Sequence, residues 1–103
     1  MTAVAVAKAS EIGPGRMRIV EAGGERIALC NVDGTFHAVQ DVCTHDEGPL
    51  GEGTLKGNAL ECPRHGARFD VRTGAVVRMP AIVPVKVYPV RVEGGDVLIE
   101  VET

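Results

Sequence analysis

Aromatic side chains and positive charge are both scarce in this chain. Its 103 residues include one tyrosine, two phenylalanines and no tryptophan, and the formal net charge is −3 at pH 7. Proteins that bind nucleic acid use a basic surface, and many also stack bases on aromatic rings. The composition therefore excludes a nucleic-acid-binding module of either kind, and we expect no nucleic-acid partner.

Long apolar runs are missing as well. The longest run near the N-terminus, residues 3–7, is shorter than the core of a signal peptide. A membrane-spanning helix needs roughly 20 consecutive apolar residues, which no part of the sequence supplies. We therefore expect no membrane association and a cytoplasmic location.

No stretch of the sequence keeps a 3.6-residue apolar period, so we expect almost no helix. Instead, short segments of alternating apolar and polar residues are separated by glycine-rich turns. The alternation predicts strands at 3–9, 16–21, 25–31, 36–40, 54–56, 59–61, 68–70, 75–77, 85–87, 90–92 and 97–101. The sequence therefore predicts an all-β fold.

Two segments in the middle of the chain each combine a cysteine and a histidine with glycine and proline. Cys43 and His45 are two positions apart, Cys62 and His65 are three apart, and sixteen residues separate the pairs. Thiolate and imidazole groups are typical ligands of zinc and of iron–sulfur clusters. Glycine and proline suit a backbone that bends closely around a bound group. The four residues are therefore predicted metal ligands.

Two kinds of metal centre fit this ligand set. A single zinc ion holds all four ligands at one point, with bonds of about 2.0–2.3 Å. A [2Fe-2S] cluster has two iron corners and takes two ligands at each. Zinc fingers usually pair like ligands with like, whereas each segment here carries one cysteine and one histidine. This order favours a cluster with both cysteines on one iron and both histidines on the other, and zinc stays as the alternative.

The Cys-Thr-His segment at 43–45 and the Cys-Pro-Arg-His-Gly segment at 62–66 resemble the two ligand loops of Rieske iron–sulfur proteins. In those proteins two histidines replace two cysteines on one iron. The resemblance implies one Rieske-type [2Fe-2S] cluster per chain. Its implied ligands are Cys43, His45, Cys62 and His65.

The strand pattern and the Rieske resemblance agree on a two-part architecture within one domain, residues 1–103. We expect a basal antiparallel β-sandwich made by residues 1–40 and 75–103. A cluster-binding subdomain, residues 41–74, is inserted into it.

Two side chains outside the ligand set have ordinary structural interpretations. With two of the three cysteines assigned as ligands, Cys30 has no disulfide partner, which fits a reducing compartment. Its neighbours are apolar, so we predict a buried small side chain and not a reactive thiol. His37 alternates with Phe36 and Ala38, so we predict an outward strand position.

The residues around the second ligand segment predict a low reduction potential. Respiratory Rieske proteins have a serine and a tyrosine that donate hydrogen bonds near the cluster, and the matching positions here are Ala67 and Phe69. They also have a disulfide between their loops, at positions matched here by Gly48 and Arg64. All four residues lack the required group. Since hydrogen bonds to sulfur tune such centres, we expect a midpoint near about −150 mV, the low end of the Rieske range.

The chain carries no second catalytic centre. Once the cluster takes its ligands, His37 is the one histidine that remains, so a mononuclear iron site with two histidines and a carboxylate cannot be assembled. No Gly-x-Gly-x-x-Gly segment is present for a flavin or nicotinamide. We therefore expect an electron carrier that is not an enzyme by itself. The family resemblance implies transfer from a flavin-dependent NAD(P)H reductase to the terminal oxygenase of an aromatic ring-hydroxylating dioxygenase system, and we expect a monomer.

Other functions remain open from the sequence. The chain also resembles the Rieske small subunit of assimilatory nitrite reductases and the Rieske donors of diiron monooxygenases. A zinc-stabilised interaction module is the alternative from another class. The loop carboxylates Asp46, Glu47 and Glu52 are either solvated charges or groups that steer a basic partner. A partner-binding collar of apolar and small residues is predicted at Pro49, Leu50, Pro63, Gly66 and Pro80.

Overall fold

The structure is a computed structural model that describes residues 1–44, 48–50, 53–63, 66–79 and 81–102. The described residues form eleven strands and one short 3-10 helix, η1 (Ala9–Glu11), so the all-β prediction is confirmed. The strands are β1 (Thr2–Lys8), β2 (Met17–Ala22), β3 (Glu25–Val32), β4 (Thr35–Gln40), β5 (Thr54–Lys56), β6 (Ala59–Glu61), β7 (Arg68–Asp70), β8 (Val76–Arg78), β9 (Val87–Tyr88), β10 (Val90–Glu93) and β11 (Asp96–Val101). Within the described part of the chain, no helix has the length and apolarity needed to cross a bilayer.

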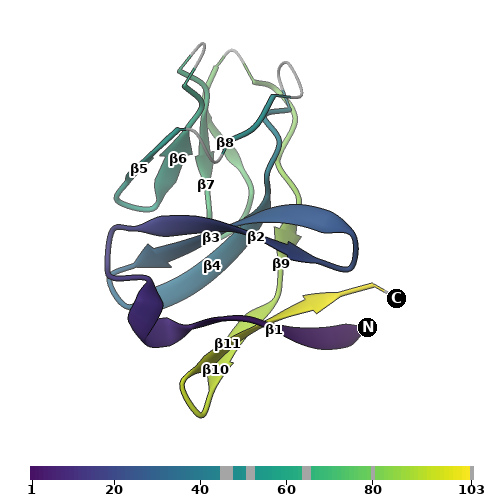
Figure 1. Cartoon of the computed structure of the whole chain (residues 1–103). Helices are drawn as coiled ribbons and strands as arrows, with labels where there is room; N and C mark the ends of the chain where they lie inside the picture. Colours follow the sequence, from purple (N-terminus) through teal and green to yellow (C-terminus); the bar gives the residue numbers. More distant parts are fainter. Residues whose placement is uncertain (45–47, 51–52, 64–65, 80, 103) are drawn as a thin grey trace.

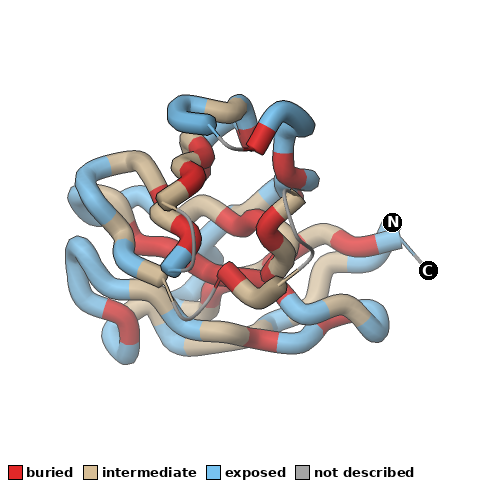
Figure 2. The backbone as a smooth tube through the Cα atoms, turned by 90° about the horizontal axis from the view of Figure 1, so that it is seen from above, coloured by how far each residue is buried: buried red, intermediate tan, exposed pale blue. Residues whose placement is uncertain are grey.

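The strands pair into three antiparallel sheets that lie one above another (Figure 1). The lowest sheet has the order β1-β11-β10, and the middle sheet has the order β2-β3-β4-β9. The uppermost sheet, β5-β6-β7-β8, is a meander of short strands. Figure 2 shows that the chain is mostly buried or half-buried where strands cross the middle of the molecule and exposed at most turns.

Strand β3 is covered on both faces, because successive side chains of a strand point to opposite sides. Ile27 and Leu29 are fully buried in a basal core between the lowest and middle sheets. Ala28 and Cys30 are fully buried in an upper core beneath the uppermost sheet. The predicted burial of Cys30 is thus confirmed, and burial raises the pKa of its thiol to about 12. The Cys30 thiol is therefore neutral and unreactive.

Alternation along the last strand, predicted at 97–101, places its apolar residues on the inner face. Val97, Ile99 and Val101 of β11 are at most 2% exposed and belong to the basal core. The strand predicted at 85–87 is displaced toward the C-terminus, because the Val85 N–H donates to the Gly74 carbonyl at 2.9 Å and not to a neighbouring strand. Strand β9 therefore begins at Val87 and pairs with β4.

Candidate metal centre

The first ligand segment leaves β4 at an ion pair whose carboxylate is buried and whose arginine is exposed. The Asp41 N–H donates to the Arg26 carbonyl at 2.9 Å, and the Arg26 Nε lies 3.3 Å from Asp41 Oδ2. The Asp41 side chain is fully buried, while Arg26 is 61% exposed. A backbone bond and a charged side-chain bond thus hold the loop entrance to β3, two residues before Cys43.

Each ligand loop is closed by a backbone hydrogen bond of the same type. The Cys43 N–H donates to the Gly48 carbonyl at 2.7 Å, and the Cys62 N–H donates to the Ala67 carbonyl at 2.7 Å. In each case the acceptor lies five residues after the cysteine. Gly66 closes the second loop further, since its N–H donates to the Cys62 carbonyl at 3.2 Å and its φ is 75°. Glycine adopts this left-handed conformation without strain.

The two cysteines share one apolar environment. Cys43 is 0% exposed and Cys62 is 1% exposed, and both belong to the upper core. Leu60 and Phe69, each fully buried, line the same core. His45 and His65 lie outside the described residues, and among the described residues no three metal-binding side chains come together. Two buried sulfur donors on matching loops fit a sulfur-ligated metal centre.

A third segment is bonded to the first ligand loop. The Thr44 hydroxyl, next to Cys43, donates to the Val83 carbonyl at 2.5 Å. This segment follows Pro80, a predicted collar residue that lies outside the described residues. The hydrogen bond fixes the segment after it, residues 81–85, beside the first ligand loop.

The predicted collar of partner-binding residues is wrong at Leu50. This side chain is 0% exposed, because it packs into the upper core with the two cysteines. The exposed apolar residues near the loops are different ones, which sequence reasoning missed. They are Val77, Met79, Ile82 and Val83, exposed by 59, 73, 81 and 53%. Their signal in the sequence is an apolar run interrupted by prolines, which cannot all be strand.

Charged groups gather around Glu61, the residue before Cys62. A hydrogen bond from Arg68, and a second from Lys56, hold the pKa of the Glu61 carboxyl below its ordinary value. His37 is half-buried on β4, opposite Cys30, and burial lowers the pKa of its imidazole. Among the described residues, the charged groups that act on His37 are Arg72 and Asp70, which lie outside the ligand loops.

Residues 2–89 match the family model of the Rieske [2Fe-2S] domain. The chain belongs to the Rieske [2Fe-2S] domain family. The family model and the relatives below confirm the predicted [2Fe-2S] cofactor, which displaces zinc as the explanation of the ligand set.

This Rieske domain is similar to ferredoxins along nearly its whole length. It is 41% identical to the ferredoxin component of biphenyl 2,3-dioxygenase from Rhodococcus jostii, over 99% of this chain and 95% of that one. It is 45% identical to the biphenyl dioxygenase ferredoxin subunit of a Pseudomonas species, over 97% of this chain and 93% of that one. These relatives are ferredoxin components and not catalytic subunits, which confirms the electron-carrier prediction.

Solved structures agree with the sequence relatives. The ferredoxin of carbazole 1,9a-dioxygenase from Nocardioides aromaticivorans has a TM-score of 0.92 at 33% identity, covering 96% of this chain and 97% of that one. A chain from a complex of reduced oxygenase and oxidised ferredoxin of carbazole 1,9a-dioxygenase has a TM-score of 0.90 at 40% identity, covering 94% of this chain and 91% of that one. A nitrite reductase small subunit has a TM-score of 0.81 at 22% identity, which shows a shared fold alone.

Proposed function

We propose that this Rieske domain carries single electrons from a flavin-dependent NAD(P)H reductase to the terminal oxygenase of an aromatic ring-hydroxylating dioxygenase system. The observation that supports it most is the near full-length similarity to ferredoxin components of such dioxygenases. Nitrite reduction has weaker support, since that likeness is confined to the fold. A cytoplasmic location and a monomeric state remain predictions.

The proposed cluster ligands are Cys43, His45, Cys62 and His65. Their support is the burial of both cysteines in one core and the identical closure of both loops. We also propose that residues 41–74 act as the cluster-binding subdomain within a basal part formed by residues 1–40 and 75–103. Strands β5 to β7 form a separate sheet that carries the second ligand loop between β6 and β7, which supports this division. Strand β8 (Val76–Arg78) extends that sheet from the residues assigned to the basal part, so the sheet continues past residue 74.

When bound, the cluster supplies a site that accepts and releases one electron. The chain's own contribution is an apolar enclosure for the sulfur ligands, because Cys43 and Cys62 are buried in the upper core. Thr44 and Asp41 fix the first loop through their hydrogen bonds to Val83 and Arg26. A rigid setting of this kind reduces the rearrangement that accompanies electron transfer.

The potential should be low and should rise when hydroxyl groups are added beside the cluster. Ala67 and Phe69 are fully buried after the second cysteine, and neither carries a donor. We expect a midpoint near about −150 mV, and a higher one in the Ala67→Ser, Phe69→Tyr double variant, because hydrogen bonds to sulfur stabilise the reduced cluster. Potentiometric titration measures both. Phe36→Tyr, on β4, is the control and should leave the midpoint unchanged, and a wild-type midpoint above about +100 mV would contradict the argument.

Reconstitution tests the proposed function. The purified chain is mixed with NADH and with the reductase and oxygenase components of the Rhodococcus jostii biphenyl dioxygenase system. We expect hydroxylated biphenyl to form only when this chain, or the native ferredoxin, is present. Product is measured by chromatography, and the Cys62→Ser variant serves as the inactive control. No product with a cluster-loaded wild-type chain would reject the proposed role.

A further inference from the structure

The outer face of the uppermost sheet carries a cluster of three cations around one carboxylate. Glu61 Oε2 lies 2.7 Å from Arg68 Nε and 3.9 Å from Arg78 Nη1, and Glu61 Oε1 lies 3.3 Å from Lys56 Nζ. Lys56 and Arg78 are 50% and 59% exposed, whereas Glu61 is 21% exposed. The four residues, which we call the cation row, therefore present a net positive surface to solvent on a chain whose overall charge is negative.

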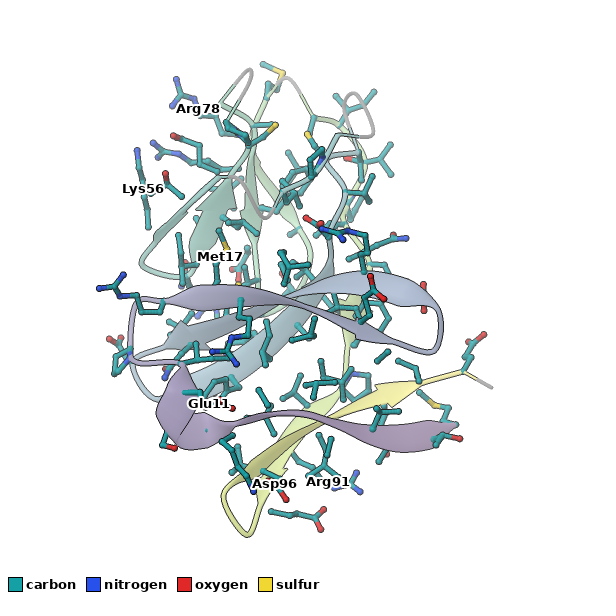
Figure 3. The ribbon with its side chains drawn as sticks, in the orientation of Figure 1. Glu11, Met17, Lys56, Arg78, Arg91 and Asp96 are labelled. Atoms are coloured by element: carbon teal, nitrogen blue, oxygen red, sulfur yellow. The ribbon has the colours of Figure 1, made fainter. Side chains whose placement is uncertain are left out.

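Three residues of the cation row lie at the end of the sheet that carries the second ligand loop. The fourth, Lys56, lies at the hairpin end of β5 and β6, and its ammonium group reaches back to Glu61. Glu61 ends β6 immediately before Cys62, and Arg68 begins β7 immediately after the loop closes at Ala67. Arg78 ends β8 next to the exposed Met79. Figure 3 shows Lys56 and Arg78 on the same side of the upper sheet, at the end of the molecule opposite Arg91.

Two of the cations face each other directly. Arg68 and Arg78 are register partners on β7 and β8. Like charges in opposite positions of neighbouring strands destabilise a sheet, and among the described residues Glu61 is the carboxylate that pairs with both. The cations outnumber the carboxylate, so the surface carries excess positive charge that attracts negative charge approaching from outside.

An apolar strip borders the cation row. Val77 and Met79, on either side of Arg78, are 59% and 73% exposed. Val83 is also exposed, and because its carbonyl accepts the Thr44 hydrogen bond it lies beside the first ligand loop; we count it with Val77 and Met79 as the apolar strip. A small apolar area rimmed by charge is the usual composition of a transient protein interface.

We propose that the cation row and the apolar strip form the docking surface for an acidic surface of the terminal oxygenase. This inference rests on the proposed function. The charge of the row selects an acidic partner, and its position beside the second ligand loop brings that partner to the cluster end. The oxygenase is chosen because a related chain, 40% identical, is found in a solved complex of oxygenase and ferredoxin.

The test removes the two most exposed cations of the row. In the Lys56→Gln, Arg78→Gln variant, the rate constant for oxidation of the reduced ferredoxin by the oxygenase should fall about tenfold at low salt. The difference should shrink at high salt, where exposed charges are screened. Stopped-flow absorbance measures this step with the oxygenase of the Rhodococcus jostii biphenyl dioxygenase, and reduction by the reductase of that system is measured separately.

The matched control is the Lys8→Gln, Arg91→Gln variant. It changes the net charge equally, but its side chains lie on β1 and β10 of the lowest sheet, 64% and 47% exposed. It should react with the oxygenase at nearly the wild-type rate. Visible spectra and midpoint potentials of both variants should equal those of the wild type, which separates docking from damage to the cluster.

Each other outcome overturns the inference. Equal slowing in both variants would mean that only net charge matters, and slowing confined to the reductase step would assign the surface to the reductase. Unchanged rates at low salt would remove any docking role. If the wild-type chain passes no electrons to the oxygenase, the proposed function itself fails, and this arm does not depend on the variants.

Discussion

Replacing Cys62 with serine should abolish the red-brown colour and reduce bound iron from two atoms per chain to nearly none. The physical reason is that a hydroxyl is a much poorer ligand than a thiolate for iron in a sulfur-bridged cluster. Cys62 is 1% exposed, so the polar hydroxyl is also placed in the apolar upper core without the cluster. We therefore expect loss of cluster and a large loss of stability together.

The matched control for this variant is Cys30→Ala. Cys30 is a fully buried cysteine of the same upper core, but it lies on β3, outside the loops. It should keep full colour and full iron, with only a modest decrease in Tm from the lost sulfur contacts. Visible absorption measures the colour, iron analysis measures the iron content, and thermal melts measure the Tm. Intact colour in Cys62→Ser, or lost colour in Cys30→Ala, would reverse the ligand assignment.

Replacing Gly53 with alanine should distort the backbone just before the second ligand loop, although Gly53 itself lies outside that loop. A Cβ at this position would lie 1.9 Å from the Glu61 carbonyl oxygen and 3.0 Å from the Leu50 carbonyl oxygen. Both atoms belong to backbone, so relief requires the chain just before Cys62 to move. We expect a loss of about 3 kcal/mol in the free energy of unfolding, at the upper end for overpacking, and a Tm lower by more than about 10 °C.

Iron content per folded chain and thermal unfolding measure the effect of Gly53→Ala. Gly13→Ala is the control, since a Cβ there meets nothing within 4 Å and the residue has no positive φ. It should be neutral in both measurements. A Gly53→Ala protein with wild-type Tm and iron would show that the approach of the two backbone segments is looser than the structure describes.

The sequence predicted best those features that depend on neighbouring residues. Strands β5 and β6 were predicted to the residue, because a glycine turn at Gly57 separates two short alternating segments. The four proposed ligands also rest on short spacings of cysteine and histidine, and their assignment stays a prediction. The start of β9 was not predicted correctly, because the hydrogen bond between Val85 and Gly74 joins residues eleven positions apart and leaves no local signal in the sequence.

Features that depend on contacts between residues far apart in the sequence could not be predicted from it. Leu50 and Val83 are both apolar residues next to a proline, yet one is fully buried and the other is 53% exposed. Only the packing of the upper core distinguishes them. The requirement for glycine at Gly53 likewise comes from the Glu61 carbonyl on another strand. The cation row was missed because its members are joined by strand register and not by spacing.

Strand β3 contributes adjacent residues to both cores, with Ala28 and Cys30 on one side and Ile27 and Leu29 on the other. The upper core also contains the two cysteines, so cofactor binding and basal packing act on the same strand. Binding energy that is available only to the native state adds to its stability. We therefore expect loss of the cluster to lower the stability of the basal core as well as that of the loop end, and the lifetime of the folded ferredoxin to follow the supply of iron and sulfide.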